Sequence, residues 1–471
     1  MPSAPHGPCG PRRFFGLEGF QALTALFQGP EHSCIAVVRM RASFAWTRRR
    51  VTGRRKRVVL GQHRERAPDG GDDVRDSDLP LRIALVSGPM VAIPPPGYAG
   101  TERVVAVLVN ELTRRGHDVT LIGPADSRVE CKIVPTIDQA LWSSGMSGDP
   151  TPYIEVTIER AWSVAHRFEV IHSHLDTLSF SFARHSPVPV LHTLHGRLDM
   201  PGVPELLDEF QDIPLVAISE SQRRWWPKNN WVATVHHGLP LEDAPFSERA
   251  GGYLAFVGRI AREKGVEAAI ELARSVNLPL HMAAKVHEED EKRLFAAVVA
   301  PAIDEGVVRF EGELATNQRD ELLAGALATV LLGAWPEPFG LVAIESMATG
   351  TPVIARRAGA LPEIVDHGLT GFLVDDVDEA RFAVREVATL DRRLVRRTAL
   401  ERFSVGRMVD EYEAVYQRMA ADASLKPSAR RRADEPVSIV GYPSTSAHDD
   451  RAAIVDATSD SATRPAVSAR P

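Results

Sequence analysis

The sequence predicts an α/β protein with two doubly wound parallel sheets. Three observations predict this fold: short apolar runs alternate with helical segments, the runs end in glycine or polar residues, and the whole pattern restarts at Gly252. Apolar runs of this kind are typical of strands buried on both faces of a parallel sheet. With 471 residues, 44% of them hydrophobic, the chain is long enough to form two separate cores.

The first series of elements starts with a strand at Leu81–Pro89. A helix is expected from about Thr101 to Arg115, where Gly116 ends it. The following strands are the apolar runs DVTLIGP, FEVIHSH, VPVLHTLHG and IPLVAIS. Because apolar runs and a helix alternate here, this part predicts the first parallel sheet.

The second series contains five strands, YLAFVGR, LPLHMAAKV, VVRFEG, ATVLLGA and TPVIARRA, with helical segments between them. His236–Gly251 is the expected linker, and Phe403–Met419 is a final amphipathic helix. We therefore expect an N-terminal domain at 81–240, joined by the helix at 403–420, and a C-terminal domain at 241–402. Two such domains place the carboxyl ends of their strands around one cleft, where ligands bind in open α/β sheets.

The two ends of the chain have a different composition. Residues 1–80 hold fourteen Lys/Arg against eight Asp/Glu, including the run RRRVTGRRKR, and the tail at 421–471 lacks periodicity. A basic arm for an anionic membrane or nucleic acid is one interpretation. We favour disordered extensions at both ends, because such segments bury too little apolar surface to fold.

Composition also limits the function classes. The whole chain has a formal net charge of −7 despite its basic start, so the body is acidic and no nucleic-acid partner is predicted. The three cysteines form no CxxC pattern, which favours a reducing compartment. No signal peptide or long apolar run is apparent, so we expect a cytoplasmic protein; a peripheral membrane contact is not predicted.

Two glutamates stand in the apolar stretch LLGAWPEPFGLVAIESMATGTPVIA, which follows a predicted strand. Glu337 lies in the loop, and Glu345 lies inside a helix that is expected to begin near Gly340. The first amides of a helix lack intrahelical partners, so Phe339, Gly340 and Leu341 can offer N–H groups to a ligand. Both carboxylates are expected to face one cleft and to accept hydrogen bonds from the hydroxyls of a sugar or ribose.

A second segment, GRIAREKG, supplies cations at another strand end. Arg259 ends the strand YLAFVGR, and Lys264 precedes the next helix. An arginine fork and a lysine point charge suit a diphosphate. The first strand-to-helix loop, PPPGYAGTERVV, adds Gly100 at a helix start, but it is not a dinucleotide fingerprint.

These segments resemble the family 4 glycosyltransferases of the GT-B fold. The matching segments stand in the family's order over residues 81–420: YAGTE, RRGHDVTLIGPADS, VIHSHLD, TLHG, AISESQR, VHHG, FVGRIAREKG and EPFGLVAIESMATGTPVIA. Two positions differ from the usual family pattern, Ala99 in the first loop and His237 in the interdomain segment. Neither difference removes a matched chemical group.

The resemblance implies a role for each matched residue. Arg259 and Lys264 would neutralise the donor diphosphate as it leaves, and Glu345 would bind the nucleotide ribose. Glu337 would lie near the donor sugar, and His195 would lie near the reacting sugar carbon, across the cleft from the donor. The amides of Phe339, Gly340 and Leu341 would contact the donor sugar and phosphate, and Gly100 would let the N-terminal domain approach the phosphate.

The expected activity is transfer of a hexosyl unit from a nucleotide-diphosphate sugar, with UDP-sugar as the expected donor, to a small-molecule, lipid or glycan acceptor. The resemblance implies retention of configuration by front-face attack. No metal or other cofactor is expected: Asp376–Asp378 is interpreted as a helix-capping loop, and His172–His174 lacks a third ligand. A nucleotide-sugar epimerase of the same fold and a non-catalytic nucleotide-sugar-binding protein are the alternatives.

Overall fold

The computed structural model describes residues 80–425 apart from residues 98 and 147. All described residues belong to one compact unit of the chain. The basic segment and most of the C-terminal tail, both predicted to be disordered, lie outside the described residues. Residues 421–425 are an exception and correct the prediction, because the last helix continues through them to Leu425. Their sequence, ADASL, contains the strong helix formers alanine and leucine.

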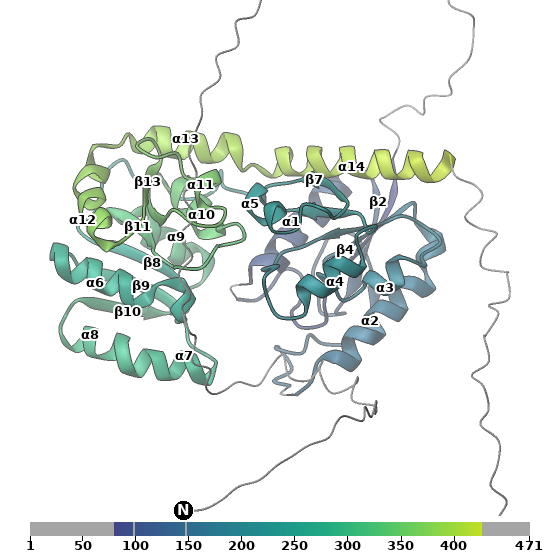
Figure 1. The fold of residues 1–471 in the computed structure, drawn as a ribbon, viewed down its shortest axis with the longest axis horizontal. Helices are drawn as coiled ribbons and strands as arrows, with labels where there is room; N and C mark the ends of the chain where they lie inside the picture. Colours follow the sequence, from purple (N-terminus) through teal and green to yellow (C-terminus); the bar gives the residue numbers. More distant parts are fainter. Residues whose placement is uncertain (1–79, 98, 147, 426–471) are drawn as a thin grey trace, which may run out of the picture. The chain divides into compact units, whose positions relative to one another are not determined.

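The first sheet has seven parallel strands in the order β3-β2-β1-β4-β5-β6-β7. Figure 1 labels β2, β4 and β7 among them. Its strands are β1 (Arg82–Val86), β2 (Asp118–Gly123), β3 (Lys132–Pro135), β4 (Val170–Ser173), β5 (Val190–Thr193), β6 (Leu215–Ala217) and β7 (Trp231–Thr234). The helices between them are α1 (Gly100–Arg114), α2 (Thr151–Ser163), η2 (Ala165–Arg167), α3 (Phe180–Ala183), α4 (Val203–Glu209) and α5 (Glu220–Trp225).

The second sheet has six parallel strands in the order β10-β9-β8-β11-β12-β13. Its strands are β8 (Leu254–Arg259), β9 (Leu280–Lys285), β10 (Val308–Gly312), β11 (Ala328–Leu331), β12 (Val353–Arg356) and β13 (Gly371–Val374). The helices that accompany it are η3 (Arg262–Lys264), α6 (Val266–Val276), α7 (Glu289–Leu294), η4 (Phe295–Val299), α8 (Ala300–Asp304), α9 (Thr316–Ala324), α10 (Leu341–Ala348), α11 (Leu361–Ile364), α12 (Val377–Glu386), η5 (Val387–Thr389) and α13 (Arg392–Arg402).

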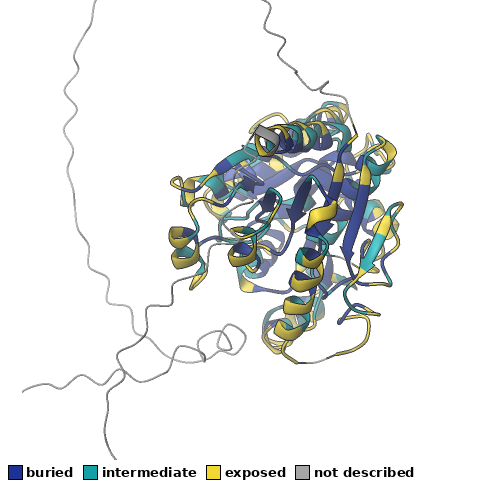
Figure 2. Cartoon of the chain, turned by 90° about the vertical axis from the view of Figure 1, so that its right-hand side faces the viewer, coloured by how far each residue is buried: buried dark blue, intermediate teal, exposed yellow. Residues whose placement is uncertain are grey.

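Both sheets confirm the predicted doubly wound α/β class. In each sheet the chain adds strands outward on one side and then restarts on the other, so β1 lies beside β4 and β8 lies beside β11. Loops diverge at such a switch point, and ligands bind outside the carboxyl ends of the strands there. Buried residues, dark blue in Figure 2, gather on the strands, while the outer sides of the helices are exposed.

The final helix, α14 (Val405–Leu425), packs against the first sheet. Tyr412 and Tyr416 are fully buried, and their hydroxyls form hydrogen bonds of 3.0 Å with Thr193 and 2.7 Å with His172. Buried hydroxyls need such partners, because an unpaired polar group inside a core destabilises the fold. The last described helix therefore completes the core of the first sheet.

The helical segment between β9 and β10 has an irregular geometry. Its two α-helices, α7 and α8, are separated by a π-helical stretch at Phe295–Val299. Pro301 follows this stretch and has no N–H to donate to the preceding turn. π-Helical geometry is rare and occurs mostly as single-turn bulges of this kind within α-helices.

Candidate active site

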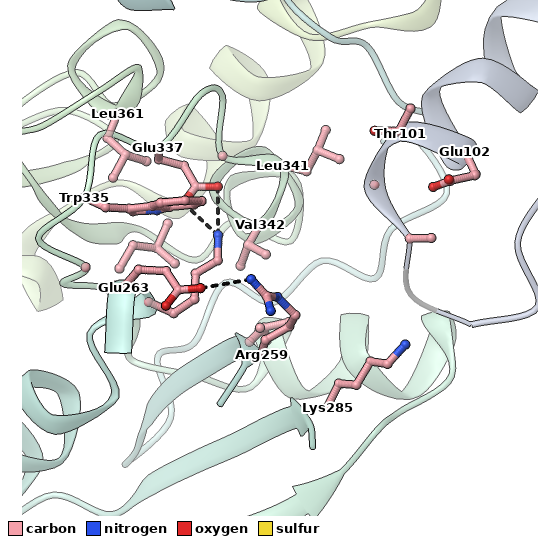
Figure 3. Close-up of a pocket in the computed structure, with 18 of the residues that line it drawn as sticks. Thr101, Glu102, Arg259, Glu263, Lys285, Trp335, Glu337, Leu341, Val342 and Leu361 are labelled. Atoms are coloured by element: carbon pink, nitrogen blue, oxygen red, sulfur yellow. Dashed lines mark hydrogen bonds and ion pairs between the residues drawn. The ribbon is translucent and has the colours of Figure 1, made fainter. Parts of the chain in front are cut away.

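A cavity of about 320 Å³ is lined by residues from the carboxyl ends of the second sheet and from the start of α1 (Figure 3). This volume falls within the range of sites that bind small molecules. Most of the residues predicted from the sequence line this cavity: Gly100, Arg259, Lys264, Glu337, Gly340 and Leu341. The cavity lining does not include the other three, Phe339, Glu345 and His195.

The two predicted phosphate-binding cations lie at the carboxyl end of β8, and both are paired with carboxylates. The Arg259 guanidinium lies 2.9 Å from Glu263 and 3.0 Å from Glu291. The Lys264 ammonium lies 2.9 and 3.1 Å from the two carboxylate oxygens of Glu337. These pairs hold the cations in place at the cavity, but they also neutralise part of their charge.

Gly265 lets the loop that carries Lys264 pass close to the loop after β11. Its φ angle is +75°, in the left-handed region that side chains disfavour. A Cβ atom at this position would lie 2.5 Å from the backbone nitrogen of Gly333. The glycine is therefore required for the close approach that brings Lys264 to Glu337.

Glu337 is held by a tryptophan that the sequence analysis did not assign. The Trp335 indole N–H donates a 2.8 Å hydrogen bond to Glu337, and the Lys264 ammonium lies 4.7 Å from the centroid of a Trp335 ring. Arg197, from the loop after β5, lies 4.9 Å from a Trp335 ring. Trp335 thus positions both the carboxylate and the ammonium. The only sequence signal for it was its place in WPEPFG.

The start of α10 agrees with the predicted geometry. Gly340 has a φ of +104° and precedes the first helical residue, Leu341, without a side-chain cap. The amides at this helix start are therefore suited to an anionic or hydroxyl-rich ligand in the cavity. The Phe339 side chain has a different place, because it is buried and packs at 4.9 Å against the ring of His237.

Glu345 corrects the prediction that both carboxylates face one cleft. It is buried on α10, with 3% of its surface exposed, and forms ion pairs with Arg103 of α1 and, at 3.2 Å, with Arg319 of α9. Its Oε2 atom is buried and has no hydrogen-bond partner among the described residues. Nearly all of α10 is buried, so a side chain one turn inside the helix meets protein rather than the cavity.

His195 belongs to a group of histidines at the carboxyl edge of the first sheet. Its Nε2 shares a 2.9 Å hydrogen bond with Nδ1 of His174, and its backbone N–H donates to Asp176 at 2.8 Å. Its ring stacks on His237 at a centroid distance of 5.3 Å. Desolvation lowers the pKa of His195 to about 4, so its imidazole is neutral at neutral pH.

Comparison with known proteins identifies the family of the chain. A family model described as Glycosyltransferase Family 4 matches residues 98–237, and one described as Glycosyl transferases group 1 matches residues 246–391. The chain belongs to the family 4 glycosyltransferases. The predicted enzyme class, a glycosyltransferase, is therefore confirmed.

Two curated relatives match this glycosyltransferase to different extents, one over most of its length and one over less than half of it. The D-inositol 3-phosphate glycosyltransferase of Mycolicibacterium smegmatis is 26% identical over 418 residues, covering 76% of this chain and 96% of the relative. The alpha-maltose-1-phosphate synthase of Mycobacterium tuberculosis is 33% identical over 247 residues, covering 44% of this chain and 63% of the relative.

Solved structures confirm the GT-B fold of the enzyme. The sucrose-phosphate synthase of Thermosynechococcus elongatus has a TM-score of 0.61 at 20% identity, covering 72% of this chain and 99% of its own. Anabaena HepE in complex with UDP-glucose has a TM-score of 0.55 at 16% identity, covering 72% of this chain and all of its own.

The glycosyltransferase cavity is also lined by three side chains to which the sequence assigned no role, Glu102, Trp142 and Lys285. Burial raises the pKa of the Glu102 carboxyl; a hydrogen bond from its own backbone N–H opposes this rise, and the nearby Asp176 carboxylate adds to it. Glu102 lies in the quoted first-loop segment YAGTE, so its position was available from the sequence. Its orientation toward the cavity depends on how α1 packs.

The two candidate metal segments of the glycosyltransferase have local partners. Asp376 caps α12, accepting a 2.8 Å hydrogen bond from the backbone N–H of Glu379, which confirms the helix-capping interpretation. Both ring nitrogens of His172 are hydrogen-bonded, to Tyr416 and to Thr193. Among the residues in the structure's described part, no group of His, Cys, Asp and Glu side chains is arranged to hold a metal ion. None of the described helices is long and apolar enough to span a membrane.

Proposed function

We propose that this glycosyltransferase moves a hexosyl unit from a UDP-linked sugar to an acceptor hydroxyl, with retention of configuration. The observation that carries the proposal is the convergence of Arg259, Lys264, Glu337 and the start of α10 on one cavity. Cations and helix amides stabilise a leaving diphosphate, while a carboxylate orients sugar hydroxyls. The choice of UDP is supported by Anabaena HepE, which has been solved in complex with UDP and with UDP-glucose.

In this proposal the cations of the chain stabilise the leaving diphosphate without a bound metal. Arg259 and Lys264 approach its oxygens as the bond to the sugar breaks, and their glutamate partners keep them oriented beforehand. The acceptor hydroxyl attacks from the side on which the diphosphate departs, and a phosphate oxygen receives its proton. His195 is neutral and positions the reacting groups across the cleft. The acceptor is a small molecule, a lipid or a glycan.

UDP-sugars are expected to raise the melting temperature of the protein more than GDP- or ADP-sugars do. A ligand at a hundred times its Kd stabilises the folded state by about 2.7 kcal/mol, which a thermal-shift screen detects readily. The same mixtures are then analysed for products with and without a panel of acceptors. An epimerised donor formed without acceptor would support the epimerase instead. A lack of any shift with all three donor classes would refute the binding site.

Glu345→Gln is expected to weaken UDP binding by roughly tenfold, because the variant loses a charged acceptor for the ribose hydroxyls. In the structure this carboxylate is 3% exposed and is covered by Arg103 of α1, so ribose binding requires α1 to move away from α10. The Oε2 atom, which has no hydrogen-bond partner among the described residues, would then accept a hydrogen bond from a ribose hydroxyl. Calorimetry with UDP and with 2′,3′-dideoxy-UDP isolates the contribution of the hydroxyls. The wild type should prefer UDP, and the variant should bind both alike.

The matched control for this experiment is Glu337→Gln, which alters the other carboxylate and should keep the preference for UDP. Because Glu345 also pairs with Arg103 and Arg319, the melting temperature of each variant is measured to separate binding from unfolding. An unchanged preference for UDP in folded Glu345→Gln would rule out the ribose role.

A further inference from the structure

Lys285 lies beside Arg259, one of the two cations proposed to bind the diphosphate. It is the last residue of β9 and pairs directly with Arg259 in the parallel ladder between β9 and β8. Residues paired in this way project to the same face of a sheet. Both side chains line the same cavity, and Figure 3 shows Lys285 beside Arg259 and apart from the Lys264–Glu337 pair.

Unlike the neighbouring Arg259 and Lys264, Lys285 has no carboxylate partner among the residues that the structure describes. Arg259 and Lys264 are neutralised by Glu263, Glu291 and Glu337. Within the described part of the chain, Lys285 forms no ion pair; its ammonium lies over Trp142, 5.1 Å from the ring centroid. An aromatic face attracts a cation but accepts no strong hydrogen bond, so the donors of this ammonium remain available.

We propose that Lys285 is a third phosphate-binding residue of this enzyme, and this inference rests on the proposed function. A diphosphate carries more negative charge than two partly neutralised cations can balance, and an ammonium supplies a point charge with three donors. The contact between its ammonium and the Trp142 ring holds the Lys285 side chain toward the cavity. The phosphate comes either from the nucleotide donor or from a phosphorylated acceptor.

The first arm of the test is calorimetry with UDP and with uridine, using wild type, Lys285→Met and Lys285→Arg. Lys285→Met should lower UDP affinity at least tenfold and leave uridine affinity unchanged, since uridine has no phosphate. Lys285→Arg should restore part of the loss, because it returns the charge. Lys292→Met is the matched control: Lys292 lies on α7, pairs with Glu289 at 2.6 Å and does not line the cavity. This control should bind UDP as the wild type does.

The second arm identifies the source of the phosphate by titrating inorganic phosphate into UDP-saturated protein. If the acceptor supplies it, Lys285→Met keeps its UDP affinity but loses the phosphate binding that the wild type shows. Wild-type affinity of folded Lys285→Met for both UDP and phosphate would overturn the assignment. A wild-type protein that does not bind UDP would refute the proposed function. In that case, titration of inorganic phosphate into the UDP-free wild type and Lys285→Met would decide the role of Lys285. If neither protein bound phosphate, the assignment of Lys285 would also be overturned.

Discussion

Replacing Lys264 by alanine is expected to lower the rate of donor cleavage by about 10²–10³-fold while the protein stays folded. Loss of one group that stabilises developing charge typically has an effect of this size. Lys264 lies in a short 3₁₀ helix, and its ammonium reaches Glu337 and Trp335 at the cavity. Release of UDP from UDP-sugars, with and without acceptors, measures the rate. Circular dichroism checks that the variant is folded.

Arg262→Ala is the matched control for this experiment, because Arg262 lies in the same short helix but away from the cavity. Its side chain is 76% exposed and pairs with Glu267 at 2.5 Å. The control should keep the wild-type rate. Near-normal cleavage by folded Lys264→Ala would contradict the assignment of this residue to the leaving diphosphate.

The second large effect is a loss of stability in mild acid. Burial lowers the pKa of five histidines around the carboxyl edge of the first sheet, which are His172, His174, His192, His195 and His237. For fully buried His192 the pKa falls to about 3, against about 6.5 in an unfolded chain. Between these values the unfolded state binds a proton that the folded state does not, so the free energy of unfolding decreases as the pH falls.

His192 alone should reduce the free energy of unfolding by about 2 kcal/mol between pH 7.5 and pH 5. Urea denaturation at the two pH values measures this difference. His192→Leu should recover about that much of the acid loss, whereas His185→Gln, at an exposed position, should leave the loss unchanged. Equal acid losses in the wild type and in a folded His192→Leu variant would show that His192 is not the titrating group.

Short residue patterns were sufficient to predict those parts of the site that lie within a single loop. Arg259 and Lys264 were predictable because strand, glycine and helix start follow one another within a few residues, and Gly340 marked a helix start in the same way. The environment of Glu345 was not predictable, since Arg103 lies 242 residues away in the sequence. Lys285 ends a strand without any motif, and its importance depends on the ion pairs of its neighbours.

In the fold as well, some elements were predictable from their own residues and others were not. Long apolar runs predicted the central strands, whereas the edge strand β3 has no fully buried residue and gave no clear apolar signal. The strands β7 and β13, which each lie at an edge of their sheet, were also missed. The π-helical stretch between α7 and α8, which precedes Pro301, was not predicted, because apolar periodicity does not distinguish π-helical from α-helical geometry.

The contact between α14 and the first sheet has a consequence for biosynthesis. Thr193 and Tyr412 are hydrogen-bonded although 219 residues separate them, and the pairing of His172 with Tyr416 spans 244 residues. A ribosome that has delivered the whole first sheet has not yet made the helix that covers these polar side chains. The N-terminal half therefore waits through synthesis of the entire second sheet, with part of its interior open to water and to chaperones, before its core can close.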